Sequence, residues 1–121
     1  SFNNLLSLSL EENHLFKVEA AWFKGIEKLE WLDLSKNFIK SLDEALTSLN
    51  SLKYLYVSNN FLDKFKVKEN QISNLIYLDI SDNFYLREIS TINSRKLLNL
   101  KINNNINLQY SKFLVNITQL K

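Results

Sequence analysis

The sequence predicts an α/β solenoid, in which short parallel β-strands and returning segments alternate along about five tandem repeats. Two observations predict it. One spacing of leucine and asparagine recurs five times along the chain, and these two residue types are over-used, at 23 and 17 of the 121 residues. A chain of this length fits one domain, so we expect residues 1–121 to form a single solenoid segment.

Each repeat follows the spacing L-x-x-L-x-L-x-x-N-x-L, with Ile or Val replacing some leucines. The first three copies run from Leu5, Leu29 and Leu52, and two further copies begin at Leu75 and Leu97, each with its last leucine one residue late. The alternating L-x-L core predicts short strands near residues 8–10, 32–34, 55–57, 78–80 and 100–102. Because no single repeat can bury its own apolar face, we expect these strands to stack into one sheet.

One asparagine closes each copy, and successive asparagines are 24, 23, 23 and 22 residues apart. They are Asn13, Asn37, Asn60, Asn83 and Asn105. A side-chain amide can donate to and accept from backbone groups that a turn leaves unpaired. We therefore predict that the five asparagines form a structural ladder along the solenoid, with no role beyond holding the fold.

These copies resemble leucine-rich repeats, and the resemblance covers nearly the whole chain. It implies a right-handed solenoid with its parallel sheet on the concave face and helical or irregular segments on the convex side, best formed near residues 20–28 and 43–49. The first copy continues with Val18, Phe23 and Ile26, which is similar to the "typical" subfamily of extracellular animal proteins that includes Toll-type receptors and insect immune proteins. The resemblance thus implies non-catalytic recognition of a protein or other large ligand, outside the cell or at its surface, in innate immunity or adhesion.

Composition excludes several other classes of function. One Gly and no Cys exclude glycine-rich phosphate loops, disulfides and Cys-ligated zinc. The single histidine, His14, leaves no nucleophile–base pair to assemble, so we predict neither enzyme activity nor a cofactor. A net charge of +2 does not indicate a nucleic-acid binder. No apolar run is long enough to span a bilayer, so we predict no membrane contact. The absence of cysteine favours an alternative setting, a cytoplasmic leucine-rich repeat adaptor that organises a protein complex.

Residues between the strand leucines are expected to point to the concave surface, which the fold does not need to fill with large apolar groups. Two columns there contain aromatic and charged residues: Trp31, Tyr54 and Tyr77 in the first, and Asp33, Tyr56, Asp79 and Lys101 in the second. An aromatic centre with a polar surround is the usual anatomy of an interface hot spot, so we predict that a protein partner binds here. The alternative is that the rings only stack on one another and stiffen the sheet.

A further column lies just past the ladder asparagines and consists of Phe38, Phe61 and Phe84. For this column, partner binding and mutual stacking remain equal alternatives. It follows His14, which with Glu11 and Glu12 forms only a weak metal-site pattern, so we predict no metal.

Two carboxylates, Asp33 and Asp79, flank Tyr56 and invite comparison with a catalytic acid pair. Two strand spacings separate them by roughly 10 Å, outside the ranges used by glycosidases, so we interpret them as solvated charges. The alternating segment 64–68 has too few basic residues and no arginine, and we predict apolar core contacts there and no nucleic-acid binding.

Asn116 begins an N-glycosylation sequon, although one sequon among so many asparagines is no argument for secretion. No polar capping unit closes either end, so we expect a piece excised from a longer protein. Uncapped apolar edges also predict end-to-end self-association, through Phe2, Leu5, Leu114 and Leu120.

Overall fold

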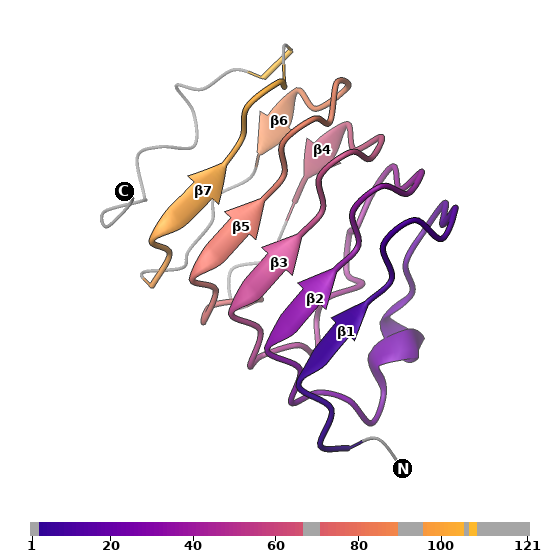
Figure 1. The fold of residues 1–121 in the computed structure, drawn as a ribbon, viewed down its shortest axis with the longest axis vertical. Coiled ribbons are helices and arrows are strands. Elements are labelled where there is room, and N and C mark those ends of the chain that lie inside the picture. The colour runs from indigo at the N-terminus through magenta and orange to yellow at the C-terminus, as the bar shows by residue number, and fades with distance from the viewer. Residues whose placement is uncertain (1–2, 67–70, 90–95, 106, 109–121) are drawn as a thin grey trace.

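The computed structural model describes residues 3–66, 71–89, 96–105, 107 and 108, and the chain winds there as a solenoid of parallel strands (Figure 1). Five strands form one sheet in the order β1-β2-β3-β5-β7, and β4 and β6 form a second, two-stranded sheet on the returning side. The elements are β1 (Ser7–Ser9), η1 (Ala20–Phe23), β2 (Trp31–Asp33), β3 (Tyr54–Tyr56), β4 (Lys64–Phe65), β5 (Tyr77–Asp79), β6 (Glu88–Ile89) and β7 (Asn99–Lys101).

Neighbouring strands of the large sheet are all parallel and in one register, so equivalent positions of successive repeats lie side by side. The central residues of the strands form one such column: Leu8, Leu32, Leu55, Leu78 and Leu100. The prediction of a parallel-strand solenoid is therefore confirmed. The fifth repeat contributes β7 and Asn105, and because most of its later residues lie outside the described part, five complete repeats stay a prediction.

Each strand begins and ends one residue earlier than predicted. The residue after the strand still donates its backbone N–H to the next turn, as Leu10 N does to Asp33 O at 2.8 Å, but the chain then bends away. Every repeat makes this bend with a residue whose φ lies in the left-handed region, between 53° and 61°. These residues are Glu12, Lys36, Asn59, Asp82 and Asn104. The ladder asparagine follows directly, so the bend directs its side chain toward the turns.

The hydrophobic core lies between the five-stranded sheet and the returning segments (Figure 1). Leu32, Leu55 and Leu78 are fully buried there, because turns cover them on both sides. In the first turn the equivalent Leu8 is only partly buried, since β1 is the edge strand of the sheet. Burial of the repeated leucines supplies the main stabilising free energy of such a fold.

The returning side contains less helix than the predicted α/β alternation requires. Within the described residues its helix is η1, one 3-10 turn, which ends just before Gly25 with φ of 87°. Residues 43–48 form turns instead of a helix. Returning segments this short cannot recover the cost of nucleating an α-helix. Two later returning segments pair as β4 and β6, and the side chains of Phe65 in β4 and Ile89 in β6 are buried.

None of the helical structure in the described ranges has the length and apolarity that a membrane crossing requires.

Candidate binding face

The ladder asparagines tie successive turns together and so hold the sheet in register. Asn83 Nδ2 donates to Ile80 O of its own turn and to Val57 O of the preceding turn, both at 3.0 Å. Its Oδ1 accepts from the backbone N–H of Leu62 at 3.2 Å. Asn37, Asn60 and Asn105 repeat this arrangement, and all four are buried. Asn13 is exposed, and its side chain donates only within its own loop, to Glu11 O at 3.0 Å.

We call the sheet surface that points away from the core the open face, which is the surface predicted to be concave. It consists of the first and third residues of each strand, because side chains alternate across a sheet. The regular register brings the two predicted columns together on this face, from Trp31 on β2 to Lys101 on β7. Each predicted concave residue therefore lies on one continuous surface.

Three of the four aromatic residues on the open face form a stack that crosses the strands. The ring centroids of Trp31 and Tyr56 are 5.4 Å apart, and those of Tyr56 and Tyr77 are 5.1 Å apart. Lys101 Nζ continues the row, 5.9 Å from the centroid of the Tyr77 ring. The half-buried state of all three rings agrees with this mutual packing, which also stabilises the sheet.

Tyr54 differs from the other three aromatic residues. It is 38% exposed and makes no ring contact with another residue of the described ranges. Its ring is therefore free to contact a partner at little cost to the fold. The sequence pattern predicts Tyr54 and Tyr56 on one face, and in the structure the Tyr54 ring is free whereas the Tyr56 ring packs against Trp31 and Tyr77.

The two aspartates of the open face have similar local roles, and Asp79 Oδ1 additionally accepts from the Ser81 hydroxyl at 2.6 Å. Asp33 Oδ1 accepts from the backbone N–H of Ser35 at 2.8 Å, and Asp79 Oδ1 accepts from that of Ser81 at 3.0 Å. These bonds close the bend after β2 and β5 and fix the direction of each carboxylate. The carboxylates thus combine a turn-forming role with an ionised group at the surface.

Lys101 is the cation of the open face. Its pKa lies above the ordinary lysine value, first because its ammonium shares a hydrogen bond with Tyr77 and then because of electrostatic interactions with Tyr77 and Asp79. The Lys101 ammonium therefore lies at the end of the aromatic row, with Asp79 as its neighbour in register.

A second aromatic row follows the edge where the chain leaves the strands. Phe38 stacks with His14 at 5.7 Å and with Phe16 at 5.5 Å, and it contacts Phe61 at 5.6 Å. Phe61 in turn meets the edge of Tyr85 at 5.9 Å. We call these five residues the edge row. Two of its ring contacts are stacked, one is tilted and one is edge-on, while Phe16 and Tyr85 are 71% and 63% exposed.

The edge row differs in membership from the predicted column. Phe84 is exposed but makes no ring contact in the described part of the chain, and Tyr85 occupies the place expected for it. The fourth repeat has one residue more between its asparagine and its last leucine, and this extra residue moves the aromatic position by one. The late Leu86 was the sequence signal that could have revealed the shift.

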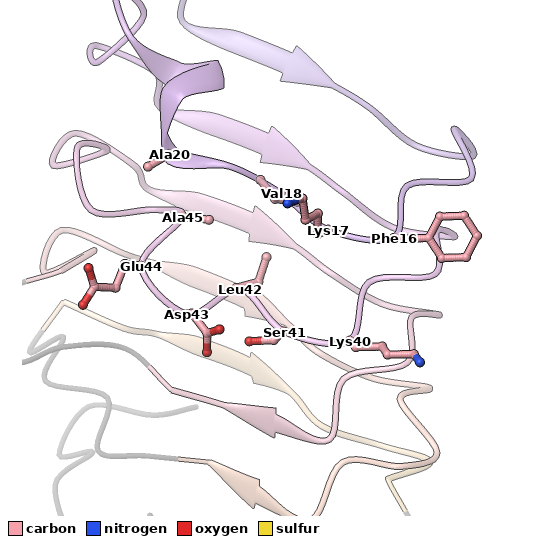
Figure 2. A pocket seen from close by; sticks show the side chains of 10 residues that line it. All are labelled: Phe16, Lys17, Val18, Ala20, Lys40, Ser41, Leu42, Asp43, Glu44 and Ala45. Atoms are coloured by element: carbon pink, nitrogen blue, oxygen red, sulfur yellow. The ribbon is translucent and has the colours of Figure 1, made fainter.

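Two hollows open beside the edge row. One, of about 330 Å³, lies between the first two returning segments, and Figure 2 shows Phe16 and Lys40 at one end and Asp43 and Glu44 at the other. The other, of about 560 Å³, is lined by Lys40, Phe61 and Tyr85 among others. Both are open surface depressions with mixed charge, so they add relief to this edge and do not form an enclosed ligand cavity.

The carboxylates beside His14 are engaged elsewhere. Glu11 and Glu12 pair with Lys36 Nζ at 3.1 and 3.3 Å, and His14 stacks on Phe38. Within residues 3–66, 71–89, 96–105, 107 and 108, no group of three or more potential metal ligands occurs. Five residues singled out in the sequence lie outside the described residues: Phe2, Val67, Leu114, Asn116 and Leu120.

The fold and the asparagine ladder define a solenoid repeat protein whose accessible chemistry lies on the open face and along the edge. Residues 3–62 match the Leucine rich repeat family, and the solenoid continues through later turns beyond the matched segment. The match and the fold together support a leucine-rich repeat protein. Proteins of this family are typically non-enzymatic modules for protein–protein recognition. No curated protein matches the chain.

Proposed function

We propose that this protein is a non-catalytic recognition module that binds a protein partner on the open, concave face of its sheet. The observation that carries the proposal is the gathering of Trp31, Tyr54, Tyr56 and Tyr77 on three neighbouring strands. Tyrosine and tryptophan contribute most of the energy of interface hot spots, and a sheet held by a ladder loses little entropy on binding.

The surround of these rings fits the same function. Asp33, Asp79 and Lys101 provide a charged rim beside an aromatic centre. Tyr54 offers the free ring, and the stacked Tyr56 offers a rigid platform, held on both sides by its neighbours. The edge row is the second surface on which a partner could dock, favoured by the exposure of Phe16, Phe61 and Tyr85.

The proposed setting is outside the cell or at its surface, in innate immune or cell-surface recognition. The similarity of the first repeat to the "typical" extracellular subfamily supports it. The competing setting is a cytoplasmic adaptor, which the absence of cysteine favours. Fractionation of the native cells tests the two directly: export into the medium or onto the cell surface supports the first, and retention in the cytosol supports the second.

The binding surface is tested by selecting peptides from a random library on the folded chain. Their affinities are then measured for Tyr54→Ala and for Tyr85→Ala, which removes the same side chain from the edge row. We expect Tyr54→Ala to cost about 2 kcal/mol of binding free energy, or about thirtyfold in affinity, and Tyr85→Ala to cost little. The opposite ranking would place the binding surface on the edge row, and unchanged affinity for both variants would contradict both sites.

A further inference from the structure

Two strands of the open face repeat one short motif, an aromatic residue, a leucine and an aspartate. They are β2, with Trp31 and Asp33, and β5, with Tyr77 and Asp79. In both, the leucine is buried, the flanking residues are half-buried, and the aspartate Oδ1 accepts from the N–H two residues on. The two motifs therefore each present a ring and a carboxylate on the open face, and only Asp79 also accepts from the hydroxyl of its serine.

Beside the motif on β5 lies a cation of the chain itself. Lys101 of the next strand is the register partner of Asp79, and its Nζ lies 5.9 Å from the centroid of the Tyr77 ring. A raised lysine pKa, caused first by the hydrogen bond with Tyr77, accompanies this contact. Lys101 thus places an ammonium group against the ring of this motif, although among the described residues it forms no ion pair with Asp79.

The motif on β2 has no such cation. The register partner of Asp33 on the next strand is Tyr56, whose ring lies against Trp31. Asp33 forms no ion pair with any residue of the described ranges. A carboxylate thus stands next to two aromatic rings, with its position fixed by Ser35 and its charge unpaired.

The charged residues around Asp33 also contain too few positive groups to balance its carboxylate. Segments 7–14, 30–36 and 53–59 contain four carboxylates and two ammonium groups, so their formal charge is −2, in a chain whose net charge is +2. Glu11 and Glu12 share Lys36, and Glu30 pairs with Lys53 at 3.2 Å. The remaining carboxylate is that of Asp33, which makes this end of the open face complementary to a positive group.

We propose that Trp31, Asp33 and Tyr56 form a site for an arginine side chain of the protein partner. A guanidinium can stack on an aromatic ring while its N–H groups bond a carboxylate, and it is more weakly hydrated than an ammonium. On β5 the equivalent ring, that of Tyr77, is contacted by the Lys101 ammonium, whereas on β2 no cation of the described residues contacts Trp31. This inference rests on the proposed function, because it names the group by which the partner is recognised on the same face.

The test uses tryptophan fluorescence in a Trp22→Phe background, which leaves Trp31 as the one remaining tryptophan. The probes are N-acetyl-arginine amide and its neutral isostere, N-acetyl-citrulline amide. We expect the arginine compound to bind about tenfold more tightly, because only it can make the cation–π contact and the ion pair. The preference should fall below about twofold in Asp33→Asn, since asparagine keeps an oxygen for the Ser35 N–H but loses the charge.

The matched control is Asp43→Asn, which makes the same change on the returning side, at an exposed residue with φ of 36° that asparagine tolerates. This control should keep the full preference for arginine. Equal affinity for the two compounds, no binding of either, or a preference that survives in Asp33→Asn would overturn the arginine site. The comparison of the two compounds in the parent chain decides the matter even if Asp33→Asn does not fold.

Failure of this site and failure of the proposed function give different results. If the arginine preference is absent but selected peptides still lose affinity for Tyr54→Ala, the open face remains the binding surface and only its proposed chemistry is wrong. If the affinity of the peptides is also unchanged by Tyr54→Ala, the open face itself is not the binding surface.

Discussion

Replacing Asn60 by alanine tests whether the ladder stabilises the solenoid. Asn60 is 2% exposed, and its Nδ2 donates to Leu34 O at 3.0 Å and to Val57 O and Ser58 O at 3.2 Å. Its Oδ1 accepts from the backbone N–H of Ile39 at 3.0 Å. Alanine removes all four bonds from the middle of the repeat array, where turns on both sides depend on them.

The expected loss follows from what remains bonded afterwards. Leu34 O keeps the Asn37 amide at 2.9 Å, and Val57 O keeps the Asn83 amide at 3.0 Å, so these carbonyls still have a donor. The N–H of Ile39 has no other acceptor in the described part of the chain and is buried. One buried donor without an acceptor costs about 1–3 kcal/mol, and the lost bonds to the carbonyls add to this cost. We therefore expect the free energy of unfolding to fall by about 3 kcal/mol.

The assay is urea unfolding followed by circular dichroism, with Asn50→Ala as the matched control because the Asn50 side chain is exposed. The control should stay within about 0.5 kcal/mol of the parent. Asn13→Ala should cost less than about 1 kcal/mol, because in the described residues the Asn13 side chain makes one bond, within its own exposed loop, and the backbone N–H keeps its bond to Asn37 Oδ1. If Asn60→Ala unfolds like the control, the ladder amide is not structural and this account of the fold is wrong.

Four further outcomes are expected. Lys36→Asn should raise the free energy of unfolding by about 0.5–1 kcal/mol in urea, because φ at this position is 57° and asparagine tolerates it better, while the exposed ion pairs lost are weak. Tyr56→Ala should lower stability by about 1–2 kcal/mol through two lost ring contacts, whereas Tyr54→Ala should leave the melting temperature unchanged. In Tyr77→Leu, the pKa of Lys101 measured by NMR should fall toward that of an ordinary lysine. Because folding raises this pKa in the parent chain, the stabilisation that accompanies it is present at neutral pH and is lost as pH rises through the folded-state pKa. Light scattering should show an apparent mass that rises with protein concentration if uncapped edges associate, and a constant monomer mass would contradict that expectation.

The repeat pattern was sufficient to predict the parallel sheet and the core. Each buried position recurs in every turn, so Leu32, Leu55 and Leu78 could be assigned to one column from spacing alone. The bends were not predictable in the same way, because their left-handed residues range from Glu12 and Lys36 to asparagine. At Glu12 and Lys36, tertiary structure imposes a backbone conformation that these residues do not prefer, whereas asparagine and aspartate tolerate it.

The returning side and the details of the open face also exceeded what the sequence pattern could predict. Phe65 was assigned to the core, but its pairing with Ile89 in neighbouring strands depends on a register that one extra residue in the fourth repeat conceals in the sequence. The columns placed Tyr54 and Tyr56 on one face, but which ring stacks and which remains free depends on rotamers set by Trp31 and Tyr77. Periodicity determines the face on which a residue lies, whereas its contacts require the neighbouring turns.

The most direct test of recognition through the open face is an NMR map of the backbone amides with and without a selected peptide. The proposed function predicts that the largest shift changes fall on β2, β3 and β5, centred on Tyr54 and Tyr56, with smaller changes on the returning side. Changes centred instead on the edge row, or on the returning segments around β4 and β6, would contradict the central claim.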